Sequence, residues 1–378
     1  MEKIKAVIVG TGFMGRVHTE AIRRLGNVAV AGVVASTAEK AERFAADFCI
    51  EHSGANYSDF LSDSTIDSVH ICTPNSLHCE MALAALRAGK HVLCEKPLAS
   101  TVAEAQQMIA LANQKKLAHC TLYNIRSYPQ VQNMRRLCES RELGEILVVQ
   151  GTYSQDWLLY DTDWNWRIES GPSRTFADIG THWCDLAEHV TGKKMTSLCA
   201  DLQTFHKTRK KPRHSVETFA GKTLRAAEYD EVSIDTEDFG AVLLRLGDKV
   251  RGAMTVSQIA TGRKNRLFVE IFGTKGSFAW DAEKPDELWI GRRSSMNSLA
   301  VKDPTLMSEK ARPYADFPAG LSEGYGDTFK QLFRGFYRTV ANRSASVEYP
   351  TFDDGLRQLR IVEAVLESSG KHKWIEVE

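Results

Sequence analysis

The stretch "VIVGTGFMGRVH" (residues 7–18) decides the fold of this chain. It begins as an apolar, β-branched run and continues into three glycines that match the pattern G-x-G-x-x-G. This pattern is typical of the turn between the first strand and first helix of a dinucleotide-binding unit, but the same spacing occurs in many tight turns. Residues further along the sequence distinguish a dinucleotide-binding turn from an ordinary tight turn.

Apolar strands and helices alternate over the first third of the chain. Residues 4–10 and 28–35 are continuous β-branched and small apolar runs, as expected of strands buried on both faces of a parallel sheet. Further strands are predicted at 68–72, 91–95 and 118–122, and helices at 12–25, 38–48, 75–88 and 103–116. This alternation predicts a doubly wound parallel sheet, a Rossmann domain that we place at residues 1–122.

In that setting each glycine has a physical role. Gly10 allows the tight turn, Gly12 lets a pyrophosphate approach the backbone, and Gly15 lets the helix pack closely on the strand. The phosphates would meet the free N–H groups at the positive end of the helix dipole. We therefore predict a cofactor site that also includes Phe13 and Met14.

The end of the second strand lacks the carboxylate that usually binds the ribose 2′-hydroxyl of NAD. It reads "VVASTAEKAERF" (residues 33–44). Without an acid there, a 2′-phosphate would not be repelled, and Ser36, Thr37 and Lys40 could hold one. The same hydroxyl groups could bind a plain ribose, so the cofactor is predicted as NAD or NADP.

Composition narrows the class of protein. The chain has 378 residues, which favours two domains, and its 48 basic and 48 acidic side chains cancel, which argues against nucleic acid or an anionic membrane as partner. The 8 cysteines include no CxxC pair, and no apolar run is long enough to span a membrane. We expect no signal peptide, because the glycine motif begins at Gly10 after an apolar stretch of only strand length. We expect a cytoplasmic protein, and we interpret the basic run "HKTRKKPRHS" (residues 206–215) as a solvated loop.

Five motifs, in order, resemble the Gfo/Idh/MocA oxidoreductases, a family that includes inositol dehydrogenases and glucose-fructose oxidoreductase. They are "VGTGFMG" (9–15), "CTPNSLH" (72–78), "AGKHVLCEKP" (88–97), "ADIGTHWCDL" (177–186) and "DDGLRQLRIVEAVLES" (353–368). The resemblance covers nearly the whole chain and implies an NAD(P)-dependent dehydrogenase acting on CH–OH groups.

Long strand-like runs in the middle of the chain, such as "DFGAVLLRLGDKVRGAMTVSQI" (residues 238–259), predict a second domain built on one large, mainly antiparallel open β-sheet. We place this substrate-binding domain at residues 123–350. Helices are too few to cover both faces of the sheet, so the open face is a predicted interface of a homodimer or homotetramer. The resemblance implies that residues 351–378, an amphipathic helix and tail, pack back near the first domain.

The motif "EKP" places Glu95 and Lys96 at the carboxyl edge of the parallel sheet, where ligands bind in such folds. A lysine there can hydrogen-bond a substrate oxygen or a cofactor ribose. The resemblance implies that Lys96 sits beside the nicotinamide, whereas a solvent-facing lysine is the structural alternative. Pro97 is a candidate for a cis peptide bond.

Asp178 and His182 are four residues apart and are expected on one face of a helix. A carboxylate beside an imidazole can orient it and stabilise its protonated form. The resemblance implies that His182 is the general base, or the acid in the reverse direction, that Asp178 tunes it, and that Lys96 polarises the substrate oxygen. A helix-surface ion pair between Asp178 and His182 is the structural alternative. His182 and Cys184 could be metal ligands, but no third and fourth ligands stand at a recognisable spacing, so no metal is predicted.

The turn at Thr73, Pro74 and Asn75 is a good helix start, with Asn75 as the candidate N-cap. The resemblance implies that this turn lines the cofactor cleft. For His78, cofactor contact and simple packing stay equally open. Asn124 is also assigned to the cofactor side.

Aromatic and charged residues gather in "SQDWLLYDTDWNWRIESG" (residues 154–171), a composition that suits a sugar. Trp157, Trp166 and Arg167 are the candidates, together with Arg126 from "YNIRSYP" (residues 123–129). A packed aromatic corner would explain any one tryptophan equally well. The residues of this segment resemble those of the levoglucosan dehydrogenase subgroup.

We therefore expect hydride transfer between nicotinamide and a secondary alcohol or ketone of a sugar, glycoside or cyclic polyol. Two alternatives are a glycosidase that keeps NAD as a resident redox catalyst and a non-catalytic dinucleotide or sugar sensor. The joint presence of Lys96, Asp178 and His182 argues against the sensor, which has no use for a proton relay.

Overall fold

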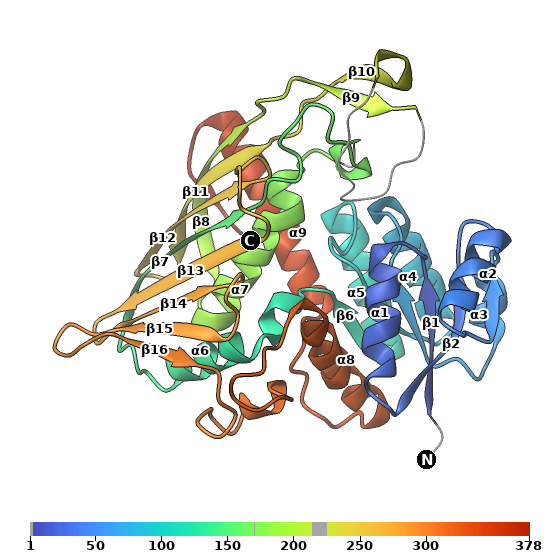
Figure 1. Ribbon diagram of the computed structural model, residues 1–378, viewed down its shortest axis with the longest axis horizontal. Helices are drawn as coiled ribbons and strands as arrows, with labels where there is room; N and C mark the ends of the chain where they lie inside the picture. Colours follow the sequence, from blue (N-terminus) through green and yellow to red (C-terminus); the bar gives the residue numbers. More distant parts are fainter. Residues whose placement is uncertain (1–2, 170, 214–224) are drawn as a thin grey trace. The chain divides into compact units, whose positions relative to one another are not determined.

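The computed structural model describes residues 3–169, 171–213 and 225–378 (Figure 1). The chain forms two compact units. Unit 1 comprises Met1–Ser127 and Gly324–Leu359, and unit 2 comprises Tyr128–Glu323 and Arg360–Glu378.

Unit 1 is built on a six-stranded parallel sheet with the strand order β3-β2-β1-β4-β5-β6. The strands are β1 (Ile4–Val9), β2 (Val28–Val34), β3 (His52–Gly54), β4 (Ser68–Ile71), β5 (His91–Cys94) and β6 (His119–Thr121). All four residues of β4 and of β5 are buried, as their continuous apolar runs require. The order reverses between β1 and β4, and the predicted doubly wound sheet is confirmed.

The helices of unit 1 form two apolar cores against this sheet. They are α1 (Phe13–Arg23), α2 (Ala38–Asp47), α3 (Tyr57–Ser62), α4 (His78–Arg87), α5 (Val102–Lys115) and α8 (Tyr325–Ala341). Helix α8 contributes Phe329, Phe333 and Phe336, each at most 1% exposed, to the core that also holds residues of α1. The sequence analysis grouped α8 with the second domain, but its aromatic face is buried in unit 1. The short elements β3 and α3 were not predicted.

Unit 2 contains a nine-stranded sheet with the order β16-β15-β14-β13-β7-β12-β11-β8-β17. Its neighbouring strands are antiparallel except for β7 and β12, so the predicted large, mainly antiparallel sheet is confirmed. The strands are β7 (Ile146–Ser154), β8 (Met195–Gln203), β11 (Phe239–Leu246), β12 (Val250–Ser257), β13 (Arg266–Gly273), β14 (Ser277–Asp281), β15 (Glu287–Gly291), β16 (Ser298–Val301) and β17 (Ile375–Glu376).

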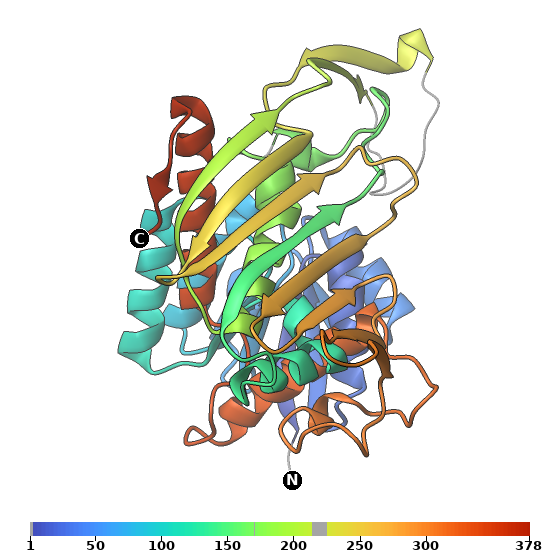
Figure 2. The same cartoon turned by 90° about the vertical axis from the view of Figure 1, so that its left-hand side faces the viewer.

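Side chains of this sheet alternate between a covered and an open face. In β11, Val242 and Leu244 are buried, whereas Leu243 is 53% exposed on the other side. Helices α6 (Pro129–Glu139) and α7 (Thr181–Thr191) lie against the covered face, and Figure 2 looks onto the face that they leave open.

The remaining elements include two that the sequence analysis did not anticipate. Strands β9 (Thr208–Pro212) and β10 (Tyr229–Ser233) form a separate antiparallel ribbon. Much of the basic run is therefore strand, and Arg209 within it is 1% exposed, so the interpretation as a solvated loop was wrong there. Residues 214 and 215 of that run lie outside the described residues. The predicted C-terminal helix is α9 (Phe352–Lys371), whose first turns belong to unit 1 and the rest to unit 2.

No helix in the described ranges is long and apolar enough to cross a membrane.

Candidate functional site

The glycine turn has the geometry of a phosphate cradle. Gly10 has a φ of 109°, and a Cβ there would lie 2.5 Å from the Cys72 carbonyl oxygen. A Cβ on Gly15 would lie 2.1 Å from the Gly10 carbonyl oxygen. At Gly12 a Cβ would meet nothing within 4 Å, although Gly12 is the N-cap of α1. Packing thus requires glycine at 10 and 15, whereas Gly12 leaves space in front of the helix dipole for an anion.

The end of β2 presents hydroxyl groups and a cation. Thr37 caps α2, its Oγ1 accepting the Lys40 N–H at 3.3 Å, and the Lys40 Nζ lies 3.3 Å from the Ser36 Oγ. All three side chains are exposed, and Ala35 stands where NAD-binding units usually carry an acid. This edge therefore carries two hydroxyl groups and a cation in place of the usual carboxylate.

The turn after β4 differs from the prediction at Asn75. A 3₁₀ turn (Asn75–Leu77) precedes α4, whose N-cap is Leu77, so the predicted N-cap role of Asn75 was wrong. The Thr73 hydroxyl is buried and, among the described residues, has no hydrogen-bond partner. A buried donor of this kind fits a ligand beside the glycine turn.

His78 holds two turns together. It is fully buried, with Nδ1 2.8 Å from the Pro97 carbonyl oxygen and Nε2 3.0 Å from the Thr73 carbonyl oxygen. Burial lowers the pKa of its imidazole, against the pull of these carbonyls. The side chain joins the turn after β4 to the turn after β5, which accounts for its presence through packing.

Glu95 and Lys96 follow β5 directly, and the Lys96–Pro97 peptide bond is cis. Glu95 is 8% exposed, and its Oε2 accepts the Lys96 N–H at 3.2 Å. Its Oε1 lies 3.1 Å from the Nε2 of His18 on α1. The carboxylate is therefore tied both to the backbone of Lys96 and to a buried histidine.

A chain of buried polar groups continues from His18. Its Nδ1 is 2.9 Å from the His70 Nδ1, and the His70 Nε2 is 2.6 Å from the Tyr337 hydroxyl, which also lies 2.9 Å from the Ser68 Oγ. Burial, followed by the proximity of His18, lowers the pKa of His70, which keeps it neutral. Because a carboxylate only accepts, the His18 Nε2 donates to Glu95, and a neutral His70 donates through one ring nitrogen and accepts through the other.

The sequence analysis did not predict this row of buried polar groups. The available signal was His18 itself, three residues after Gly15 and hence on the inner face of α1. We refer below to Ser68, Tyr337, His70, His18 and Glu95 as the histidine chain.

In unit 2, Asp178 and His182 do not share one regular helix. Asp178 lies in a π-helical turn (Phe176–Gly180), and His182 lies in the first turn of α7 that follows. At Gly180 a Cβ would come within 2.7 Å of the Phe176 ring, so glycine permits the wide turn. Turns of this kind are frequent at functional sites.

Asp178 is held from two sides. The Nε2 of Gln258 donates to its Oδ2 at 2.9 Å, and the Nε of Arg167 lies 3.3 Å from its Oδ1. The Arg167 guanidinium carbon is also 4.6 Å from the centre of the Trp166 ring. The structure thus brings together three predicted residues, Asp178, Arg167 and Trp166, and adds Gln258, whose only signal was its place near the end of a predicted strand-like run.

The other predicted substrate residues have different surroundings. Trp157 is half-buried against the small apolar cluster of Leu158, Ile168 and Ile234, and its Nε1 donates to the Gln155 Oε1 at 2.7 Å. Trp166, by contrast, is 37% exposed. Trp157 thus packs within its own segment, whereas Trp166 has an exposed ring surface beside Arg167.

Asn124, Arg126 and Phe13 are engaged within unit 1. The Asn124 Nδ2 donates to the Thr328 Oγ1 at 2.8 Å, and the Arg126 guanidinium pairs with the Asp354 carboxylate at 2.7 Å. Phe13 is 51% exposed and stacks on Tyr325, with ring centres 6.4 Å apart. In the described part of the chain no group of three or more metal-ligating side chains is found.

Comparisons with known proteins bear on both units. A family model described as "Oxidoreductase family, NAD-binding Rossmann fold" matches residues 4–123, and one described as "GFO/IDH/MocA C-terminal domain" matches residues 131–279. A levoglucosan dehydrogenase of Pseudarthrobacter phenanthrenivorans is 32% identical over 392 residues, covering 100% of this chain and 99% of its own.

Two further relatives extend this picture. A glucose-6-phosphate 3-dehydrogenase of Bacillus subtilis is 26% identical over 376 residues, covering 99% of this chain and 98% of its own. A solved structure of levoglucosan dehydrogenase in complex with NADH and levoglucosan superimposes with a TM-score of 0.88 at 28% identity, covering 100% of both chains.

Proposed function

This chain belongs to the Gfo/Idh/MocA oxidoreductases, a family with an NAD-binding Rossmann domain, and from that premise we propose the chemistry that its residues perform. It is an NAD-binding dehydrogenase of the sugar and polyol type. The proposed reaction transfers a hydride between nicotinamide and a secondary alcohol or ketone of a sugar, glycoside or cyclic polyol.

Unit 1 would hold the cofactor, which supplies hydride acceptance and donation when bound. The pyrophosphate is assigned to the turn at Gly12, next to Phe13 and Met14, and the Thr73 hydroxyl to the same ligand. Ser36 and Lys40 are assigned to the ribose or its 2′-phosphate. NAD and NADP both fit this edge, and the preference is measurable by titration.

Proton transfer is assigned to unit 2. His182 would take the hydroxyl proton during oxidation and return it during reduction. Asp178 supports the imidazolium form by its charge, and the contacts with Gln258 and Arg167 keep that carboxylate in place. Lys96 is assigned to hydrogen-bond the alcohol oxygen or the cofactor ribose, as a compact cation can.

The main support for a sugar as the substrate class is the position of Arg167. Arg167 touches both Asp178 and the exposed ring of Trp166, so one side chain joins the proposed proton-handling group to an aromatic surface. Aromatic faces stack on the C–H surfaces of sugars while charged groups bind hydroxyls. Together with the similarity to levoglucosan dehydrogenase, this favours a cyclic sugar such as an anhydrosugar as the substrate.

The experiment that tests the cofactor site compares Gly12→Ala with the wild type by titration with NADH and NADPH, followed through tryptophan fluorescence. A Cβ at position 12 meets nothing in the protein, so the melting temperature should stay within about 2 °C while binding weakens at least about tenfold. Gly326→Ala, also with open space around its Cβ, is the matched control. Unchanged NADH binding in Gly12→Ala would contradict the assignment.

The test of the chemistry is turnover of levoglucosan and related polyols with stoichiometric NADH formation. His182→Ala should lower kcat by about 10² to 10⁴, the contribution of general acid–base catalysis. Glycoside cleavage with no net NADH formed would point instead to a resident-cofactor glycosidase, and NADH binding with no turnover would point to a sensor.

We also propose that the open face of the nine-stranded sheet joins copies of this chain as a homodimer or homotetramer. On that face Leu243 stands opposite Ala253 in β12 and Cys199 in β8, and Leu243 is 53% exposed. Apolar side chains in such a row favour burial against another surface. Light scattering should give a multiple of the 42.2 kDa chain mass, and Leu243→Asp should lower it.

A further inference from the structure

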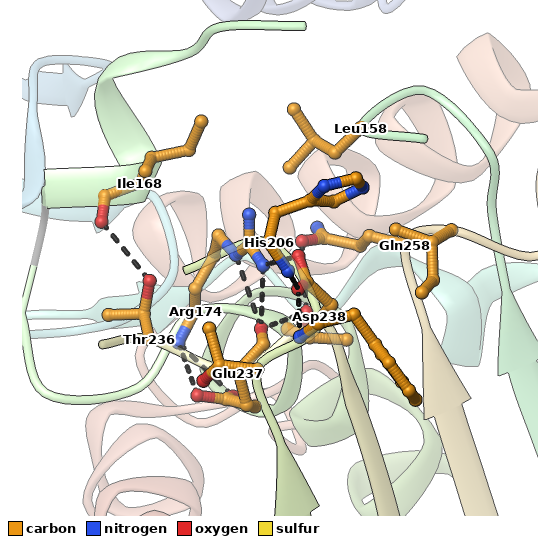
Figure 3. A network of polar contacts seen from close by, with 12 residues as sticks. Leu158, Ile168, Arg174, His206, Thr236, Glu237, Asp238 and Gln258 are labelled. Atoms are coloured by element: carbon orange, nitrogen blue, oxygen red, sulfur yellow. Dashed lines mark hydrogen bonds and ion pairs between the residues drawn. The ribbon is translucent and has the colours of Figure 1, made fainter. Parts of the chain in front are cut away.

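A cluster of charged side chains is buried in unit 2, away from water. Arg174, Arg209 and Asp238 are each at most 1% exposed. Figure 3 labels Arg174 and Asp238 of this cluster. The Arg209 guanidinium donates to the Asp238 Oδ1 at 2.8 Å, and Arg174 pairs with the same oxygen. The other carboxylate oxygen accepts the backbone N–H groups of Phe205 and His206 at 2.7 and 3.0 Å.

The cluster keeps its charge. Burial works to raise the pKa of Asp238, but the two guanidinium groups and the backbone donors together lower it. A buried ion pair is not in itself a source of stability, because apolar side chains of the same volume often do as well. The question is therefore what the charges hold in place.

Most hydrogen bonds of the Arg209 guanidinium go to one segment of the chain, residues 158–163. Besides Asp238, its guanidinium donates to the carbonyl oxygens of Leu158 at 2.9 Å, Tyr160 at 2.8 Å and Asp163 at 3.2 Å. These residues lie in an irregular stretch without ladder partners of its own, so its carbonyls need donors from elsewhere. The imidazole Nε2 of His206 adds a contact to the Leu159 carbonyl oxygen at 2.8 Å.

The same cluster reaches Asp178 through Gln258. The backbone N–H of Gln258 donates to the Asp238 carbonyl oxygen at 3.1 Å, and its own carbonyl accepts the Leu158 N–H at 3.2 Å. Its side chain then donates to Asp178. Gln258 is fully buried, and Figure 3 shows it between Leu158 and Asp238.

We propose that Arg209 is a positioning residue for substrate selection. By binding three carbonyls of residues 158–163, it fixes the segment that leads to Trp166 and Arg167, and through Asp238 and Gln258 it holds that segment in register with Asp178. This inference rests on the proposed function, because it takes residues 157–167 as the wall that contacts the sugar. A preformed wall discriminates between sugars better than one that must be ordered on binding.

The experiment compares Arg209→Lys and Arg209→Met with Lys210→Met. Lysine retains a buried charge but cannot reach three carbonyls and a carboxylate at once. Lys210 is the matched control, because it is the next residue of β9 and its Nζ pairs with Asp161 of the same segment at 2.9 Å, but in a solvent-exposed pair. Methionine at 209 replaces the guanidinium with an apolar chain and serves if the lysine variant folds poorly.

Three quantities are measured on the full chain: the NADH dissociation constant, KM for levoglucosan, and the ratio of kcat/KM for levoglucosan to that for D-glucose. Both Arg209 variants should raise KM about tenfold or more and reduce the ratio at least several-fold. NADH binding should change less than about twofold, and Lys210→Met should resemble the wild type. A merely structural role would lower stability and leave the ratio unchanged, which would overturn the proposal.

Hydrogen exchange separates this inference from the proposed function. Amides of residues 158–163 should exchange faster in the Arg209 variants and not in Lys210→Met. Unchanged exchange would overturn the positioning role whatever the kinetics show. If the wild type binds NADH but oxidises no sugar or polyol, the proposed function fails, and the exchange result still decides whether Arg209 fixes this segment.

Discussion

The two units support their proposed functional residues with buried polar networks of opposite kinds. Behind Glu95 in unit 1 stands the histidine chain, in which one carboxylate is followed by two imidazoles and two hydroxyl groups. Behind Asp178 in unit 2 stands a cluster in which Asp238 lies between two guanidinium groups. The first network is a line of imidazole and hydroxyl groups that ends on one carboxylate, and the second is a cluster of charged side chains.

The difference shows in what surrounds each network. The rings of His18 and His70 both pack edge-on against Phe333, with ring centres 4.9 Å apart in each case. Burial lowers the pKa of His70, because taking up a proton among these apolar neighbours would carry a large desolvation cost. The guanidinium groups of unit 2 instead contact carbonyls and carboxylates, as buried charge requires.

The charged cluster should be the more costly to break. Asp238→Asn keeps the shape but leaves the guanidinium groups of Arg174 and Arg209 buried without a full counter-charge, which should lower the free energy of unfolding by about 3–5 kcal/mol. Urea unfolding followed by tryptophan fluorescence is the appropriate measurement, because all 7 tryptophans lie in unit 2.

The control for that variant is Asp161→Asn, which removes the exposed partner of Lys210 and should cost at most about 0.5 kcal/mol. If the two substitutions lower the free energy of unfolding equally, burial of the Asp238 cluster does not increase the cost of breaking it.

Unit 1 should be the more sensitive to mild acid. Burial, followed by the charge of Arg343, lowers the pKa of His91 to about 4, and burial also lowers the pKa values of His70, His78 and His119. A lowered histidine pKa means that the unfolded state binds protons first, so stability is lost as pH falls below about 6.5. For His91 alone the loss between pH 6.5 and 5 should be about 1.6 kcal/mol.

Circular dichroism, which reports both units, should at pH 5 show an earlier urea midpoint than tryptophan fluorescence, which reports unit 2. His91→Asn, whose amide oxygen can still accept the Ala118 N–H, should lessen the pH dependence. Two results would contradict the greater acid sensitivity of unit 1. One is coincidence of the circular dichroism and fluorescence transitions at pH 5, and the other is an unchanged pH dependence of stability in His91→Asn.

The smallest effect is expected from the middle of the histidine chain. His70→Phe removes its links to His18 and Tyr337 but keeps the aromatic packing, and Tyr337 retains Ser68 as a partner. The loss at pH 7 should be about 1 kcal/mol, the size of an ordinary hydrogen bond. Because phenylalanine has no proton to gain, the deficit relative to the wild type should shrink at pH 5. A deficit that grows on acidification would show that His70 is not the neutral link described here.

Several features followed from the sequence because their signals are local. The alternating strand and helix periods predict the parallel sheet, and the tight turn expected at Gly10 and the close packing expected at Gly15 agree with the φ of 109° at Gly10 and the lack of space for a Cβ at Gly15. Asn75 was misjudged because one 3₁₀ turn shifts the start of α4, a change that N-cap preference alone cannot detect. Arg209 was misjudged because its neighbours in the basic run are hydrophilic, and only the pairing of β9 with β10 points its side chain inward.

The sequence by itself determined the two sheets and the glycine turn, because apolar periodicity and glycine spacing act between near neighbours, whereas the roles of Lys96, Asp178 and His182 were implied by the family resemblance. Only the tertiary structure decided which buried polar groups meet. His18 reaches Glu95 across 77 residues, and Gln258 reaches Asp178 across 80. A buried polar group must find a partner wherever the fold supplies one, and no pattern within a single segment of sequence carries that information.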